Sequence, residues 1–136
     1  MFETYLTVAG RVISDVNVRT VASGDKVSSF RMVAQERRFN RETQDWADGD
    51  KLYVNVKCWR KLAENVSASL SKGDQVMVQG RLYLNQYEIN GEPKQSIELD
   101  ARMVGPDLFW CTAMLQRPQR AAATSDDPVT PSVVAA

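Results

Sequence analysis

Apolar and polar residues alternate strictly over residues 52–59, a pattern that predicts a β-strand with two unlike faces. One face carries four apolar side chains that we expect to line a core: Leu52, Val54, Val56 and Cys58. The other face carries Tyr53, Lys57 and Trp59. Small polar residues are usual on a solvent face, because an aromatic ring left in water forgoes the free energy of burial. The pattern therefore predicts that something planar docks on this face.

Two interpretations of the aromatic face remain open from this segment alone. Nucleic-acid bases are planar and tethered to a phosphate chain, so a face that alternates aromatics with cations suits an unpaired strand. Alternatively, a long loop or a second subunit covers Trp59 or Tyr53, since large aromatics often anchor cores and interfaces.

The same alternation predicts four more strands, over residues 6–12, 30–39, 76–84 and 97–103. Between residues 61 and 71 the period changes. Leu62, Val66 and Leu70 recur every four residues and Lys72-Gly73 follows, which predicts a short amphipathic helix ended by a glycine. An Asn90-Gly91 pair predicts a hairpin turn between the last two strands. Five strands with one helix between the third and the fourth describe an all-β, five-stranded OB-fold barrel.

A polar connection over residues 38–50 joins the second and third strands and carries Phe39 and Trp46. Its 13 residues are many for a structureless hairpin loop, and long loops in compact domains tend to be functional or mobile. The alternative is a solvated β-extension in which Trp46 packs on the sheet.

The balance of charges limits how this chain could hold nucleic acid. Seventeen basic and 17 acidic residues give a formal net charge of zero. This balance argues against a protein that holds a duplex mainly by phosphate attraction, so any affinity has to depend on stacking.

The residue types present exclude several kinds of site. The chain has no histidine, and its two cysteines, Cys58 and Cys111, do not form a CxxC pair. A usual zinc site and a histidine-based triad are therefore excluded, and we expect no metal, no cofactor and no catalysis. We also expect Cys58 to be a small core residue, and the lack of a disulfide framework favours a reducing compartment.

Composition divides the chain into a domain and a tail. We expect residues 1–116 to form the OB-fold and oligomerisation domain. Residues 117–136 are rich in Ala, Pro, Ser, Thr and Val, and we expect a disordered tail there, because too little apolar bulk remains to offset ordering entropy. The first residues lack signal-peptide features and no run is long enough to cross a bilayer, which predicts a soluble, unexported protein without membrane contact.

Three segments in combination resemble the bacterial single-stranded DNA-binding protein family, over roughly residues 3–105. They are FRMVAQER at residues 30–37, WRKLAENV at 59–66, and LSKGDQV at 70–76 followed by QGRL at 79–82. The resemblance implies that four aromatics stack bases: Phe39, Tyr53, Trp59 and Tyr87. We expect six cations near the phosphate path: Arg31, Arg37, Arg38, Arg41, Lys57 and Arg81.

The resemblance also implies a function. It is non-sequence-specific binding of single-stranded DNA by a cytoplasmic, nucleoid-associated homotetramer that protects single strands in replication, recombination, repair or DNA uptake. We expect residues 107–115 to contribute to the subunit interface. Family members typically end in an acidic tip with a terminal apolar pair, whereas this sequence ends in SVVAA with only Asp126-Asp127 upstream. We therefore expect a short-tailed paralogue that recruits replication and repair proteins poorly.

Other functions compete with this one. An OB-fold protein of RNA binding or primosome assembly would bind oligo-U and oligo-dT comparably. A structural subunit would instead use the barrel face for protein contacts. Mutation of Trp59 would then break assembly, and there would be no nucleic-acid binding to lose. An enzyme is the least favoured class, because the acids are scattered and no nucleophile–base pair can be assembled without histidine.

Overall fold

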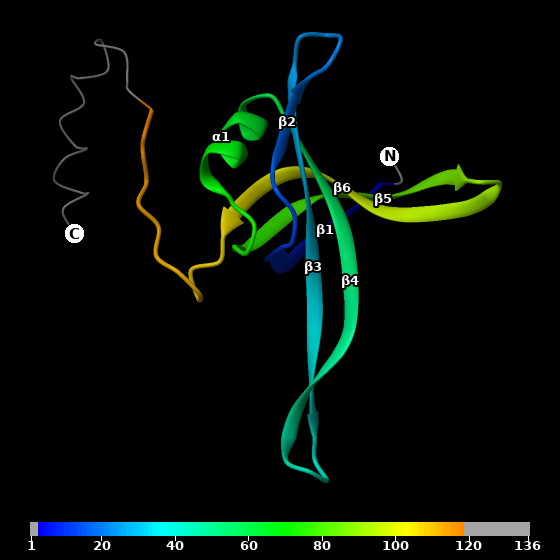
Figure 1. The fold of residues 1–136 in the computed structure, drawn as a ribbon. Helices are drawn as coiled ribbons and strands as arrows, with labels where there is room; N and C mark the ends of the chain where they lie inside the picture. The colour runs from blue at the N-terminus through cyan, green and yellow to red at the C-terminus, as the bar shows by residue number, and fades with distance from the viewer. Residues whose placement is uncertain (1–2, 119–136) are drawn as a thin grey trace, which may run out of the picture.

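The computed structural model describes residues 3–118, and Figure 1 shows their arrangement. In order along this part of the chain, the elements are β1 (Thr4–Val12), β2 (Asn17–Thr20), β3 (Lys26–Asn40), β4 (Asp45–Trp59), α1 (Lys61–Ser69), β5 (Gln75–Ile89) and β6 (Glu92–Pro106). Most of the predicted tail, 117–136, lies outside the described residues, so the division of the chain near residue 116 stays a prediction.

Five of these strands close into a ring. The order is β1–β5–β6–β4–β3, and β3 returns to β1 through the pairs Arg11–Val33 and Val12–Met32. The neighbours pair antiparallel except β4 and β6, which run parallel over three residue pairs. The predicted OB-like barrel with one helix is therefore confirmed. An additional short strand, β2, pairs with β3 and has four exposed residues, so it left no alternating signal in the sequence.

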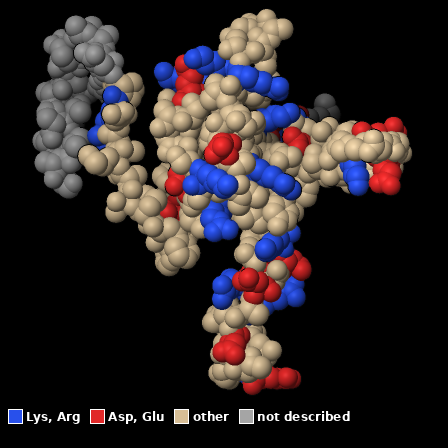
Figure 2. All heavy atoms as spheres, in the orientation of Figure 1, with Lys and Arg blue, Asp and Glu red and all other residues tan. Residues whose placement is uncertain are grey.

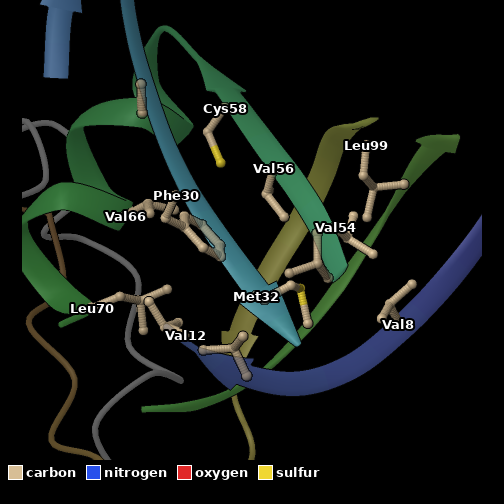
Figure 3. Packing of buried hydrophobic residues seen from close by; sticks show 13 residues of the cluster. Val8, Val12, Phe30, Met32, Val54, Val56, Cys58, Val66, Leu70 and Leu99 are labelled. Atoms are coloured by element: carbon tan, nitrogen blue, oxygen red, sulfur yellow. The ribbon is translucent and has the colours of Figure 1, made fainter. Parts of the chain in front are cut away.

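Apolar side chains from the strands and α1 fill the barrel, as Figure 3 shows. Val54, Val56 and Cys58 are buried as predicted, and burial raises the pKa of the Cys58 thiol to about 11. Leu52 is the exception, because its side chain is 41% exposed. It lines an apolar hollow together with Leu6, Ala34 and residues of β5 and β6. Alternation fixes the face of a strand but not the point at which the barrel ends, so the prediction for Leu52 was wrong.

The helix is shorter than its sequence pattern predicts. It ends at Ser69, and Leu70 is extended, although its backbone N–H still donates to the Val66 carbonyl at 2.9 Å. Ala63, Val66 and Leu70 reach the core. Gly73 has a φ of +101° in the turn that follows, where its N–H donates to the Val12 carbonyl at 2.8 Å. The glycine therefore directs the chain into β5 and does not end the helix.

Two long hairpins project from the barrel in different directions (Figure 1). We call the outer part of the first, residues 36–50, the β3–β4 ribbon. It continues the antiparallel pairing as far as Asn40 and Asp45, so residues 38–50 form the β-extension and not a loop. The pairing jumps from Gln35–Lys51 to Arg37–Asp48, so β4 holds one extra residue there, a β-bulge.

The second hairpin joins β5 to β6 through Asn90 and Gly91. Their φ values are +53° and +83°, and two positive φ values in succession are typical of the tight turn that the Asn-Gly pair predicted. Tyr87 lies near its tip, opposite Lys94. The hairpin therefore carries this aromatic side chain beyond the barrel.

Candidate nucleic-acid interface

Trp59 and Tyr53 lie on the outer face of β4, where the alternation placed them. Their side chains are 43% and 44% exposed, and no loop of the described chain covers them. In the register of the sheet, Trp59 is opposite Val27 and Tyr53 is opposite Val33. Both valines are buried, at 2% and 8% exposure, although neither belongs to the barrel core. Each ring therefore has a buried neighbour on the outer side of the sheet and keeps much of its surface open to solvent.

A cation lies over one of these rings. The guanidinium carbon of Arg31 is 4.8 Å from the centre of the Tyr53 ring, a cation–π arrangement between β3 and β4. Arginine also offers a flat surface on which a base can stack. Arg31 and Tyr53 together form a compact, partly exposed platform.

A buried carboxylate organises the polar groups beside the platform. Glu98 of β6 is only 5% exposed, and it accepts hydrogen bonds from Asn55 Nδ2 and Ser96 Oγ, both at 2.8 Å. Lys57 Nζ lies 3.9 Å from its other oxygen. A buried carboxylate with these partners is satisfied, and it fixes Asn55 and Lys57 on the outer face. Lys57 therefore carries a charge that Glu98 offsets.

Arg81 of β5 lies two strands from Lys57 on the same outer face. Its Nη2 donates to Asp100 Oδ2 at 2.7 Å. Its guanidinium carbon is 4.5 Å from the centre of the Tyr83 ring. Partial burial and the nearby carboxylates Asp100 and Glu98 raise the pKa of Tyr83. Like Lys57, Arg81 is paired with a carboxylate and is not a free cation.

The predicted site residues on the β3–β4 ribbon form a separate group. The rings of Phe39 and Trp46 lie directly opposite each other, with centroids 5.2 Å apart and planes tilted by 59°. Arg37 contacts Asp48 at 3.5 Å, and Arg38 contacts both Glu36 and Asp50. Arg41, in the turn, makes no ion pair with any residue from 3 to 118.

The structure thus divides the predicted site into three places. Arg31, Tyr53, Lys57, Trp59 and Arg81 share the outer face of the barrel. Phe39, Arg37, Arg38 and Arg41 lie on one hairpin, and Tyr87 lies on the other (Figure 1). Figure 2 shows blue Lys and Arg side chains gathered over the barrel and charges of both signs on the hairpins. A ligand that contacts all of them has to be extended and flexible, and their role in binding stays a prediction.

Sequence reasoning gave no role to two tyrosines of the outer face. Tyr83 lies beneath Arg81, and Tyr5 lies beneath Arg102, whose guanidinium is 4.5 Å from the ring centre and donates to the hydroxyl at 2.8 Å. Tyr5 donates in turn to Glu3 at 2.7 Å, which raises the pKa of Tyr5 and lowers that of Glu3. Tyr83 shares the strand phase of Arg81 and Tyr87, and this phase was the signal that could have identified it.

Two further properties of residues 3–118 limit the chemistry of the site. No group of three or more Cys, Asp or Glu side chains in this range could hold a metal ion. No helix in the same range has the length and apolar character needed to cross a membrane. The prediction about recruitment of other proteins concerns residues 126–136, outside the described part of the chain.

Comparisons with known proteins agree with this geometry. Residues 4–106 match the Single-strand binding protein family. A single-stranded DNA-binding protein of Corynebacterium glutamicum is 43% identical over 119 residues, which are 87% of this chain and 53% of that protein. The chain thus spans about half the length of this relative.

Two solved structures are also similar. The small single-stranded DNA-binding protein of Streptomyces coelicolor has a TM-score of 0.75 at 34% identity, over 81% of this chain and 99% of that one. The second single-stranded DNA-binding protein of Mycobacterium smegmatis has a TM-score of 0.68 at 39% identity, over 85% of this chain and 100% of that one. These relatives are named for binding, which agrees with the prediction that the chain is not an enzyme. The chain belongs to the single-strand binding protein family.

Proposed function

We propose that this protein binds single-stranded DNA without sequence specificity by stacking bases on exposed rings. It would thereby protect single strands in replication, recombination, repair or DNA uptake. One observation carries the proposal. The rings of Phe39, Tyr53, Trp59 and Tyr87 are all 41–44% exposed. Val54, Val56 and Cys58, which alternate with Tyr53 and Trp59 along β4, are fully buried. The exposed rings of Tyr53 and Trp59 therefore belong to a well-packed sheet and not to a loose one.

The charges of the outer face support stacking as the leading contribution. Lys57 and Arg81, the two predicted cations at its centre, are each paired with a carboxylate. Each phosphate neutralised on a single strand contributes about −0.7 to the slope of log affinity against log salt. Each stacked base contributes about 1–3 kcal/mol. We therefore expect a moderate salt dependence, with the six predicted cations lining the phosphate path.

A homotetramer is the assembly that we propose, in the cytoplasm and associated with the nucleoid. Support comes from residues 107–115, which leave the barrel after β6 and carry several large apolar side chains. Leu108, Phe109, Trp110, Met114 and Leu115 are between 63% and 98% exposed. An apolar segment of this kind marks an interaction surface. A strand that passes over several barrels gains affinity through effective concentration.

Light scattering coupled to size-exclusion chromatography tests the assembly. The wild-type chain is expected at four times the monomer mass, and Phe109→Ser with Trp110→Ser is expected to shift it to smaller species. A monomeric wild-type protein would contradict the tetramer. An unchanged tetramer in the double variant would contradict the role of residues 107–115.

Tryptophan fluorescence during titration with oligo-dT tests the binding proposal. We expect quenching that saturates at stoichiometric DNA, and weaker quenching and affinity in Trp59→Ala. Trp59→Phe is the matched control, since it keeps an aromatic ring on β4, and it is expected to bind oligo-dT more tightly than Trp59→Ala. Unchanged affinity in folded Trp59→Ala would contradict base stacking on the barrel. Comparable affinity for oligo-U would favour RNA binding, and loss of assembly alone would favour the structural-subunit alternative.

A further inference from the structure

Tyr83 repeats on β5 the arrangement found at Tyr53 on β4. In both places an arginine guanidinium lies over the ring, at 4.8 Å for Arg31 on Tyr53 and 4.5 Å for Arg81 on Tyr83. Tyr83 is half-buried, and no role was assigned to it from the sequence. The repetition on one face of the barrel suggests a shared use for the two pairs.

The register of the sheet connects the β4 aromatics to Tyr83 through a row of residues that lie side by side on neighbouring strands. Asn55, two residues after Tyr53 on β4, pairs with Glu98 of β6, and Glu98 pairs with Tyr83 of β5. Neighbouring strands lie about 4.8 Å apart, so Tyr83 lies roughly 10 Å from Asn55 across the sheet. The side chain of Asn55 donates to Glu98, which ties the middle of the row together. The row is therefore a continuous outer surface from the β4 aromatics to β5.

Tyr83 also lies on the way to Tyr87. The two tyrosines are four residues apart on β5 and share one face of the strand, which places them roughly 13 Å apart at about 3.3 Å per residue. Without Tyr83, a strand that contacts both Tyr53 and Tyr87 would have no ring to stack on between them. Tyr83 occupies this gap.

We propose that Tyr83, with Arg81 stacked on it, is a further nucleotide-stacking position that carries single-stranded DNA from Tyr53 and Trp59 to Tyr87. The proposal rests on the proposed DNA binding. A base stacks on the exposed side of the Arg81–Tyr83 pair, because guanidinium planes and aromatic rings are both stacking surfaces for unpaired bases.

The charges around Tyr83 indicate that stacking, and not attraction to phosphates, is its contribution to affinity. Arg81 is paired with Asp100 at 2.7 Å, and Lys57 lies 3.9 Å from Glu98. Two positive and two negative side chains leave this patch with no net charge. The partly buried hydroxyl also stays protonated at neutral pH, since its pKa is raised from 10.0. Contacts at Tyr83 are therefore expected to contribute affinity without steepening the salt dependence.

Fluorescence anisotropy with a length series of labelled oligo-dT tests this position in the full chain. Tyr83→Ala is expected to lower affinity about 5- to 150-fold, the range that the loss of one stacked base implies. The slope of log affinity against log salt is expected to stay unchanged. Tyr83→Phe, which keeps the ring, is expected to bind like the wild type. Leu84→Ala is the matched control, because Leu84 is the next residue on β5 and is itself exposed.

The outcomes separate this inference from the function on which it rests. Wild-type affinity in Tyr83→Ala, with weakened binding in Trp59→Ala, overturns the role of Tyr83 and leaves the proposed function standing. Indifference of the wild-type protein to oligo-dT overturns both. Loss of affinity in Tyr83→Phe equal to that in Tyr83→Ala also overturns the inference, since the ring would then not be the group that binds.

Photocrosslinking of the wild-type chain removes any dependence on how the variants fold. An oligo-dT that carries 5-iododeoxyuridine is irradiated in complex with the protein, and the modified residues are located by mass spectrometry. A crosslink at Tyr83 supports the proposal. Crosslinks at Trp59 and Tyr87 without one at Tyr83 overturn it.

Discussion

Strand β4 passes through two environments, and its aromatic side chains are held differently in each. In the barrel, Tyr53 and Trp59 alternate with Val54, Val56 and Cys58, which are fully buried. On the β3–β4 ribbon, none of the residues 45–50 of β4 is buried. Trp46 there contacts Phe39, and exposed ion pairs such as Arg37–Asp48 complete the ribbon.

This difference shows that a packed core holds exposed rings in place before a ligand binds. An exposed ion pair contributes about 0–1 kcal/mol and an aromatic pair about 0.5–1.5 kcal/mol, so the ribbon rings are held weakly. The barrel rings stand on a sheet whose other side is close-packed. Ordering a mobile group on binding costs free energy, so a ring on the barrel is worth more to affinity than an equal ring on the ribbon.

The largest effect is expected for stability, from Phe30→Ala. Phe30 is buried in the barrel core, and truncation of such a residue costs about 3–5 kcal/mol. Trp46→Ala removes a larger ring from the ribbon but is expected to cost only about 1 kcal/mol, since Trp46 is 62% exposed. Urea denaturation followed by circular dichroism measures both. Similar losses in the two variants would mean that the ribbon shares the core's stability.

A smaller effect is expected for DNA affinity, from Tyr53→Ala. Loss of this barrel ring is expected to cost about 1–3 kcal/mol of binding free energy. Phe39→Ala, on the ribbon, is expected to lower the binding free energy by less, because ordering the hairpin offsets part of the stacking free energy of Phe39. Anisotropy titrations with labelled oligo-dT give both values. A larger loss for Phe39→Ala would reverse the comparison.

A third effect concerns the support that Trp46 gives to Phe39. We expect Trp46→Ala to weaken oligo-dT binding by about 0.5–1.5 kcal/mol, because the Phe39 ring loses the partner 5.2 Å away. The double variant with Phe39→Ala is then expected to bind no worse than Phe39→Ala alone. Additive losses in this cycle would show that Trp46 contacts DNA independently.

The smallest effect is expected from Asp48→Asn, which releases Arg37 from its ion pair. Stability should change by less than about 1 kcal/mol, since the pair is exposed. The freed cation can neutralise one more phosphate, which would steepen the slope of log affinity against log salt by about 0.7. Asp45→Asn is the control, because Asp45 makes no ion pair within residues 3–118. Equal slopes in Asp48→Asn and the wild type would place Arg37 away from the DNA.

Much of the barrel follows from alternation, because one side of each strand must be buried. Val54, Val56 and Cys58 were predicted in the core and lie there, and the turn at Asn90-Gly91 follows from residues that accept positive φ. The exposure of Leu52 was not predicted, because the pattern of one strand does not reveal where the neighbouring strands of the barrel end. The sequence left residues 38–50 open between a loop and a β-extension for a related reason, since polar residues exposed on both faces give no period.

Features that depend on pairing between distant strands could not be predicted. Glu98 is an acidic residue of β6, and its burial depends on Asn55, Ser96 and Lys57 meeting it from β4 and from its own strand. The link from Tyr53 to Tyr83 depends on the parallel register of β4 and β6. A single sequence contains the side chains of such a network but not the alignment that brings them together.

The β-bulge in β4 decides which way Trp46 points. On the barrel, each odd-numbered residue of β4 is opposite an odd-numbered residue of β3, and Tyr53 is opposite Val33. Beyond the bulge the numbering shifts by one, so even-numbered Trp46 is opposite odd-numbered Phe39. Partners directly across antiparallel strands share a side, so the irregularity keeps Trp46 and Phe39 on the side of Arg31 and Tyr53. If the same residues paired regularly, without the bulge, the indole would turn to the opposite side although the composition would be unchanged.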